Sequence, residues 1–208
     1  MIQPTRPRLL GDFVREDAES FPLHKQWTEQ QYLALDTNRL VELNDGKIEV
    51  LPMPTQWHQM IALFLYEQLR AITREHRLGL TLAAPLRIRL WPGKFREPDV
   101  VFMLAANKSR RGDQFWDHAD LVMEVVSDDD PPRDLVTKRD EYAKSGIAEY
   151  WIVDPRDRSI RVLTLDADTN PGVYREMACY ALGQIAESVL LPVFRVELSQ
   201  VFDETREF

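Results

Sequence analysis

The sequence predicts an α/β domain with a mixed central sheet flanked by helices, and three observations carry this prediction. Residues 99–104 and 120–127 are short, nearly continuous apolar runs, which is typical of strands buried on both faces. Residues 55–76 repeat apolar side chains every three to four positions, which predicts a helix with one core-facing stripe. The order helix, strands, helix, strand then favours an α/β layer arrangement.

Length and composition indicate a soluble protein of one domain. The 208 residues suffice for a full core, and we expect an N-terminal arm over residues 1–26 and a single domain over 27–208. No apolar run reaches the ~18 residues that span a bilayer, and the N-terminus lacks the apolar segment of a signal peptide. We therefore expect a cytoplasmic protein with no membrane partner and no organic cofactor. The lone Cys179 excludes an internal disulfide, and the histidines lack zinc-site spacing.

The first predicted elements are a short helix and a hairpin. Residues 27–35 read as a helix, in which Thr28 and Gln31 have the spacing of a capping box. Residues 39–52 form two apolar runs around Asn44-Asp45-Gly46, which predicts a β-hairpin.

The later elements continue the alternation. Residues 80–91 read as one strand or as two strands separated by Pro85. A helix is predicted from about residue 131 to 145, with Asp130 as its cap and Gly146 as its stop. A buried strand over 148–154 follows. We expect two or three strands, at 159–165, 173–180 and 188–195, to extend the sheet, and a short helix after residue 196.

Three carboxylates stand where apolar residues would be expected. Asp99 opens one buried strand, Glu124 lies in the middle of the next, and Glu42 lies within the hairpin. A buried carboxylate must be paired, hydrogen-bonded, metal-bound or protonated, because burying it alone is costly. For any one acid, a cap or an edge salt bridge is the better explanation. Two acids in consecutive apolar strands, followed by a cationic helix, favour a metal site.

The chemistry of these acids indicates which metal would bind. Two carboxylates ~4 Å apart repel by ~4 kcal/mol at an effective dielectric constant of about 20, and a divalent cation removes that cost. Asp99 and Glu124 can share one side of a sheet, and the backbone carbonyl of Val125 could add a further oxygen. Hard oxygen ligands without His or Cys favour Mg²⁺ or Mn²⁺ over zinc.

Position alone predicts that Lys138 faces solvent, as most helix lysines do, with its stem along the apolar face. It flanks the stripe marked by Leu135 and Tyr142, while Arg139 lies nearer the middle of that stripe.

Several segments, in order, resemble the Uma-type bacterial putative restriction endonuclease family of the PD-(D/E)XK nuclease superfamily. They are VELNDGKIEVLPMPTQWHQ (41–59), EPDVVF (97–102), LVMEVVS (121–127) and RDLVTKRDEYAKSGIAEYWIVDP (133–155). The resemblance covers about residues 27–165. It implies a restriction-endonuclease-like fold and a Mg²⁺- or Mn²⁺-dependent endonuclease that hydrolyses DNA.

The resemblance also assigns roles to single residues. It places the motif acids at Asp99 and Glu124. A lysine would follow at position 126 in the plain motif, but this chain has Val126, and the family is thought to carry its lysine on the next helix, here Lys138. Glu42 matches an upstream acid that binds metal or water, and His58 matches a family histidine that could contact phosphate or shuttle a proton.

Other signature positions are expected to be structural. Glu149 is expected to form hydrogen bonds and Asp154 to form a turn. Glu67, on the first helix, is expected to be exposed.

The chain departs from the family at residues 127–130, where SDDD replaces a pattern that is often SPST. These aspartates could attract a second metal, repel DNA, or simply form a solvated helix cap. The net charge of −8 argues against a broad basic surface, although a local strip remains compatible with it. Arg87, Arg89 and the loop with Lys108, Arg110 and Arg111 are the candidates for such a strip.

Two rival functions stay open. One is a non-catalytic module that keeps the nuclease fold and binds nucleic acid or protein. The other is an enzyme acting on RNA or a nucleotide. Many superfamily members also form homodimers, although nothing in the composition demands one here.

Overall fold

A computed structural model describes residues 26–37, 39–166, 168–203 and 205 of the chain. The N-terminal arm predicted over residues 1–26 lies outside this part, except for Gln26. Within the described residues no helix is both long and apolar enough to cross a membrane.

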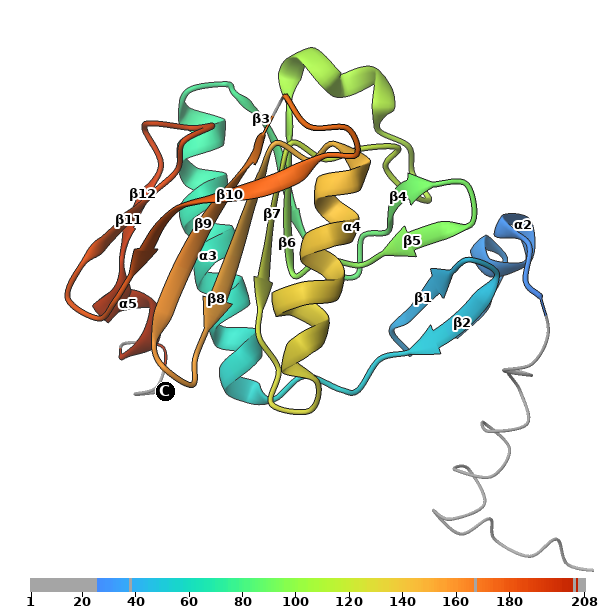
Figure 1. Ribbon diagram of the computed structural model, residues 1–208, viewed down its shortest axis with the longest axis horizontal. Helices are drawn as coiled ribbons and strands as arrows, with labels where there is room; N and C mark the ends of the chain where they lie inside the picture. The colour runs from blue at the N-terminus through green and yellow to red at the C-terminus, as the bar shows by residue number, and fades with distance from the viewer. Residues whose placement is uncertain (1–25, 38, 167, 204, 206–208) are drawn as a thin grey trace, which may run out of the picture.

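A mixed sheet of six strands forms the centre of the protein (Figure 1). Only one neighbouring pair is parallel, β7 with β8, and the other pairs are antiparallel. In spatial order the strands are β10 (Val173–Tyr180), β9 (Ser159–Asp166), β8 (Glu149–Asp154), β7 (Leu121–Val125), β6 (Val100–Leu104) and β3 (Gly79–Ala83). The predicted α/β class with a mixed central sheet is thereby confirmed.

Two helices cover opposite faces of this sheet, α3 (Gln56–Glu75) and α4 (Lys138–Ser145) (Figure 1). Because side chains alternate along a strand, odd- and even-numbered residues of β7 enter different cores. Leu121, Met123 and Val125 pack with α3, while Val122 and Val126 pack with α4. Glu124 therefore belongs to the α4 face of the sheet.

A smaller antiparallel sheet lies beside the α4 face, with strand order β2-β1-β5-β4. The predicted hairpin is confirmed as β1 (Val41–Asn44) and β2 (Lys47–Val50). Asp45 and Gly46 have φ of +49° and +84°, as a tight hairpin turn requires. The sheet is completed by β5 (Lys94–Arg96) and β4 (Ile88–Trp91), and α2 (Glu29–Leu33) packs against it. Thr28 and Gln31 form the predicted capping box.

The segment around Pro85 forms two strands, because β3 joins the large sheet and β4 the small one. After β6, a 3₁₀ helix, η1 (Ala105–Arg110), connects to the loop that leads to β7.

The predicted helix over 131–145 exists, but its first turns are irregular. Residues Arg133–Thr137 form a π turn, η2, in which the Lys138 N–H donates to the Arg133 carbonyl, five residues back. Asp130 accepts the Arg133 N–H through its backbone carbonyl, and no side chain caps η2. Gly146, with φ +87°, ends α4 as predicted.

The predicted strand over 188–195 is wrong, although β9 and β10 are confirmed. Instead, β11 (Ile185–Glu187) and β12 (Arg195–Glu197) form a separate two-stranded sheet. The Glu149 carboxylate binds the N–H groups of Val189 and Leu190, at 2.8 and 2.6 Å, which leaves neither N–H for a strand ladder. The predicted C-terminal helix is α5 (Leu198–Phe202), which packs beside α3.

Burial along α3 predicts that substituting two leucines, two positions apart, changes the stability of the protein by very different amounts. Leu65 is 0% exposed and Leu63 is 51% exposed. We expect Leu65→Ala to lower the free energy of unfolding by about 2–5 kcal/mol, because it leaves a cavity under the sheet. Leu63→Ala should change it by no more than about 0.5 kcal/mol. Urea unfolding of both variants measures this, and equal losses would contradict the helix register.

Candidate active site

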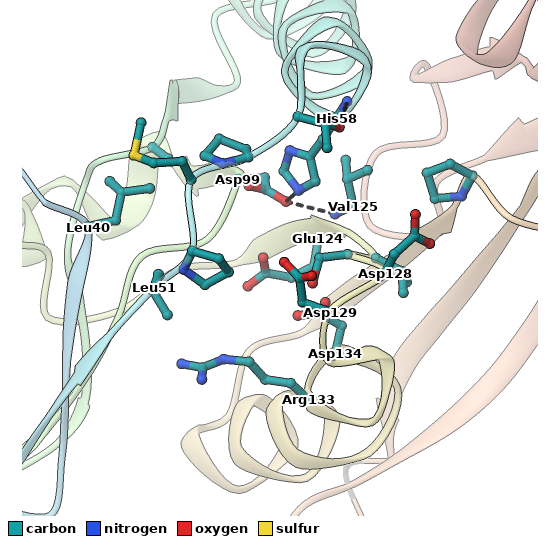
Figure 2. A pocket seen from close by; sticks show the side chains of 18 of the residues that line it. Leu40, Leu51, His58, Asp99, Glu124, Val125, Asp128, Asp129, Arg133 and Asp134 are labelled. Atoms are coloured by element: carbon teal, nitrogen blue, oxygen red, sulfur yellow. Dashed lines mark hydrogen bonds and ion pairs between the residues drawn. The ribbon is translucent and has the colours of Figure 1, made fainter. Parts of the chain in front are cut away.

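A cavity of about 390 Å³ opens where the N-terminus of α3, the start of β6, the end of β7 and the η2–α4 helix meet (Figure 2). Five residues predicted for the site line it: His58, Asp99, Glu124, Val125 and Lys138.

Sheet pairing brings Asp99 and Glu124 together. Val100 pairs with Met123, so continuing this antiparallel register places Asp99 opposite Glu124. Val101 and Val122, two residues from each acid, both pack on the α4 face, so the two acids share that side of the sheet.

The carboxylate of Asp99 is fixed by its neighbours. Its Oδ2 accepts a 2.8 Å hydrogen bond from the Val125 N–H and lies 3.3 Å from Nε2 of His58 (Figure 2). His58 lies in the first turn of α3, where the Thr55 side chain caps the helix by accepting the His58 N–H. Burial disfavours a charged imidazole, but the hydrogen bond and charge of Asp99, together with Glu124, raise the pKa of His58.

Glu124 is buried and held at both oxygens. Oε1 accepts a 2.5 Å hydrogen bond from the Tyr142 hydroxyl, and Oε2 lies 3.0 Å from Nζ of Lys138. Lys138 is only 6% exposed, so the expectation from position alone, a solvent-facing lysine, is wrong. Arg139, expected nearer the middle of the stripe, is partly exposed and donates to the Tyr174 carbonyl instead.

Asp134 is a further cavity residue that the sequence analysis did not identify. It is buried, and its Oδ1 lies 2.9 Å from Nζ of Lys138 but takes part in no hydrogen bond. Its position four residues before Lys138 indicates that the two side chains can pair. That spacing gives no sign that the pair is buried.

Carboxylates are concentrated in this part of the cavity. Glu124 and Asp134 both contact the ammonium group of Lys138, and Asp99 lies beside His58. Burial, and then the charges of Asp99 and Asp134, raise the pKa of Glu124, although Lys138 and Tyr142 act against the rise. Burial would lower the pKa of Lys138, but the charges of Glu124 and Asp134 outweigh it and raise that pKa, so the amine stays charged.

This donor set fits a hard divalent cation. Two carboxylates and a backbone carbonyl are oxygen ligands, and an added cation would relieve the repulsion among the acids. Among the residues that the structure describes, no group of three or more His, Cys, Asp or Glu side chains could hold a metal ion by itself. Mg²⁺ sites commonly use only one or two carboxylates, with water and substrate phosphate supplying the rest.

Comparison with protein families matches residues 29–199 to the Uma2 family, described as putative restriction endonuclease. The chain belongs to the Uma2 family. Among solved structures, a putative nuclease of the DUF820 group from Anabaena variabilis has a similar fold, with a TM-score of 0.67 at 17% identity over 86% of this chain and 98% of that one. The chain thus has the predicted restriction-endonuclease-like fold. No curated protein matches its sequence.

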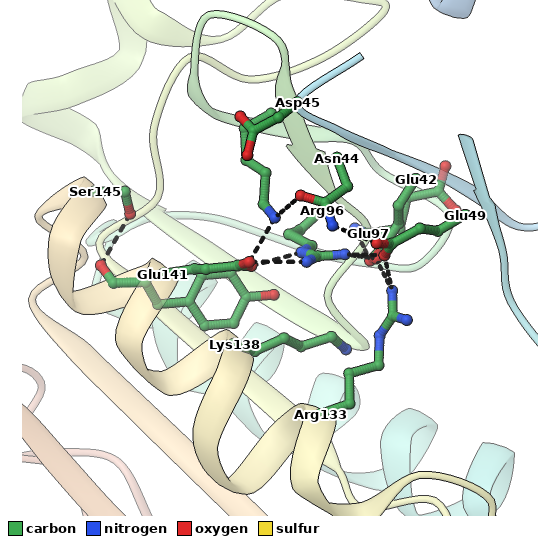
Figure 3. Close-up of polar contacts among 12 residues, drawn as sticks. Glu42, Asn44, Asp45, Glu49, Arg96, Glu97, Arg133, Lys138, Glu141 and Ser145 are labelled. Atoms are coloured by element: carbon green, nitrogen blue, oxygen red, sulfur yellow. Dashed lines mark hydrogen bonds and ion pairs between the residues drawn. The ribbon is translucent and has the colours of Figure 1, made fainter. Parts of the chain in front are cut away.

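Glu42, the upstream acid of this Uma2 family member, does not line the cavity. It is 0% exposed and lies in a neighbouring buried charge cluster (Figure 3). The guanidinium groups of Arg96 and Arg133 donate to its Oε2, and the Glu97 N–H donates to Oε1 at 3.0 Å. Burial opposes the charged form, yet Arg96, Lys138 and Arg133 lower the pKa of Glu42 to about 2.

Arg133 connects this cluster to the cavity. It lines the cavity from η2 and also contacts Glu49, at 2.9 Å, on the hairpin (Figure 3). Arg96 contacts Glu141 of α4 as well, at 2.7 Å. The small sheet is therefore joined by ion pairs to the helix that carries Lys138.

The other acids singled out in the sequence lie either at the cavity or elsewhere in the fold. Asp128 and Asp129 of the SDDD run line the cavity, while Glu67 is exposed as expected. Glu149 is the expected hydrogen-bonding residue, since it accepts from Trp151 Nε1 at 2.6 Å. Asp154 accepts the Arg156 N–H at 3.1 Å in the turn after β8.

The predicted basic strip is partly neutralised. Arg87 pairs with Glu97, and Arg89 pairs with Glu29 and Asp117. Arg111 donates to the backbone carbonyls of Met103 and Leu104.

The burial of Glu42 predicts a structural effect that Glu49 should not reproduce. Glu42→Ala should lower the free energy of unfolding by about 3–5 kcal/mol, because Arg96 would lose its fully buried partner. Glu49→Ala, whose side chain is 28% exposed, removes a contact with the same two arginines and should cost clearly less. Chemical unfolding of both variants gives the comparison, and a smaller loss for Glu42→Ala would contradict the cluster.

The raised pKa of Glu97, which also lines the cavity, makes the stability of the protein depend on pH. Burial and the charge of Glu42 raise the pKa of Glu97 from 4.5 to about 7. The folded state therefore binds this proton more tightly, and the associated stability is lost as pH rises from about 5 to 8. Between pH 5 and 8 the free energy of unfolding of the wild type should fall by about 2–3 kcal/mol relative to that of Glu97→Gln. Unfolding at a series of pH values measures this, and a pH-independent difference would exclude it.

Proposed function

We propose that this protein is a Mg²⁺- or Mn²⁺-dependent endonuclease that hydrolyses phosphodiester bonds of DNA. The observation that carries the proposal is the meeting at one cavity of Asp99, just before β6, with Glu124 of β7 and Lys138 of α4. Membership of a family described as putative restriction endonuclease supports a nucleic-acid substrate.

Asp99, Glu124 and the Val125 carbonyl would hold the metal ion. When bound, the ion supplies Lewis acidity that polarises the scissile phosphate and lowers the pKa of a water. The Val125 N–H and His58 keep the Asp99 carboxylate in position. The Tyr142 hydroxyl does the same for Glu124.

Lys138 and His58 supply positive charge from the protein itself. The Lys138 ammonium offsets the negative charge that develops on phosphate in the transition state. His58 lies beside Asp99 with a raised pKa, which suits it to contact a phosphate oxygen or to pass a proton. Glu42 acts indirectly in this scheme, because it positions Arg133 at the cavity wall.

The proposal also concerns the binding partner, the oligomeric state and the location of the protein. DNA is the proposed partner, while a homodimer and a cytoplasmic location stay predictions. The acidic Asp128 and Asp129 at the cavity favour the rival, a module that binds without cleaving, because they repel a phosphate backbone.

The decisive test is metal-dependent cleavage by single variants. Asp99→Ala and Glu124→Ala should each reduce Mn²⁺-dependent DNA cleavage at least about 100-fold while the protein stays folded, because each removes a metal ligand. Chelation by EDTA should abolish wild-type cleavage. Gel assays on supercoiled DNA, with circular dichroism to verify folding, provide the measurement.

Glu67→Ala is the matched control, since it removes an exposed carboxylate from α3 without touching the cavity. Full cleavage by either the Asp99 or the Glu124 variant would refute the site. A wild type that binds DNA but never cleaves it, with any divalent metal, would favour the non-catalytic module. Parallel assays with RNA separate the remaining rival.

A further inference from the structure

A second hollow, of about 380 Å³, lies at the far end of α3 from the cavity and is strongly basic. We call it the arginine hollow and define it by its five cationic residues. They are Arg70, Arg74, Arg77, Lys108 and Arg111. The other lining residues are neutral, so no carboxylate balances these charges within the hollow.

Most of these cations have no intramolecular counter-ion. Within the described part of the chain, no ion pair reaches Arg70, Arg74, Arg77 or Lys108. Arg111 donates only to backbone carbonyls and lies over the Trp116 ring at 5.7 Å, so its charge is also uncompensated by an acid. Five such cations in a chain of net charge −8 form a local field suited to an anion.

The fold holds the hollow in a fixed shape. Arg70 and Arg74 are one turn apart on α3, which separates them by ~6 Å along the helix axis. Beneath them, the hydroxyl groups of Thr73 and Thr81 share a buried 2.9 Å hydrogen bond that joins α3 to β3. Hydrogen bonds from the Leu78 N–H to Thr73 and from the Ala105 N–H to Leu78 tie in the loop after α3 and the start of η1.

The two sites share one rigid element. His58 lies in the first turn of α3 and Arg74 in its last, and sixteen residues at 1.5 Å each separate them by ~24 Å along the helix axis. Neither site includes a residue of the other. Four of the cations are exposed, and they come from α3, the following loop and η1. The fifth, Arg111, directly follows η1 and is partly exposed. This spread suits a chain of phosphates better than one enclosed phosphate.

We propose that the arginine hollow binds the phosphate backbone of DNA and anchors the substrate ~24 Å from the cavity. This inference rests on the proposed function. A protein of negative net charge needs a local group of cations to bind a polyanion, and the α3 arginines would provide it. Arg87 and Arg89 are bound to carboxylates and contribute less to that binding.

The test measures DNA binding without cleavage. Fluorescence anisotropy of a labelled duplex several turns long is recorded as salt is raised, in a Glu124→Gln background with EDTA. Adding Arg74→Glu and Lys108→Glu should weaken binding at least about tenfold and make the salt slope shallower by ~2, because two phosphate contacts are lost. Both residues are exposed, and melting temperatures verify that the variants fold.

The matched control is Arg175→Glu with Arg195→Glu, which changes the net charge equally. These exposed residues lie on β10 and β12, away from β3, which borders the hollow at the opposite edge of the large sheet. The control should weaken binding by no more than about twofold. Equal losses in both double variants would overturn the inference, because they would indicate a non-specific effect of net charge.

Two further outcomes separate this inference from the proposed function. If the wild type binds DNA through the hollow but cleaves nothing, the inference stands and the proposed catalysis fails. If it cleaves DNA and the Arg74/Lys108 double variant binds as tightly as wild type, the inference fails and the catalysis stands. Calorimetric titration with inorganic phosphate should show no saturable binding. The assignment to DNA would be overturned if phosphate did bind saturably, if only the hollow substitutions removed that binding, and if duplex binding stayed unchanged.

Discussion

The buried pair of Glu124 and Lys138 is the interaction on which the site depends. A carboxylate in the centre of a buried strand is tolerated only because an ammonium and a hydroxyl reach it from α4. Both contacts hold α4 against the sheet. The fold also places Asp99, beside His58, and Asp134, beside Lys138, at the same cavity.

A second group of buried charges connects the small sheet to the same helix. Arg96 reaches Glu42 and Glu49 on the hairpin and Glu141 on α4, and Arg133 reaches the hairpin from η2. Each arginine contacts at least two of these carboxylates, so the effect of removing one member depends on the others. This explains how Glu42 can stand in a family motif without lining the cavity: it holds Arg133 at the cavity wall.

In the described part of the chain, a group of cations without acidic partners lies far from the candidate site, in the arginine hollow. The cavity is rimmed by Asp128 and Asp129, whereas the arginine hollow has no acid in its lining. Helix α3 contributes to both, since His58 lies near its start and Arg74 at its end. One rigid helix thus separates the place where a phosphodiester would be cut from the place where the polyanion would be retained, with the acidic cavity left to attract the metal.

Local sequence patterns were enough to predict the elements with strong signals and the two motif acids. Hairpin chemistry at Asp45-Gly46, the apolar stripe of α3 and the runs around Asp99 and Glu124 are local patterns, and each has its expected structure. Only the tertiary structure decided the burial of Lys138 and Asp134, because the π turn shifts the helix face that a regular period predicts. It also decided that residues 188–195 form no strand and that Glu42 binds arginines, since both outcomes depend on partners distant in the chain.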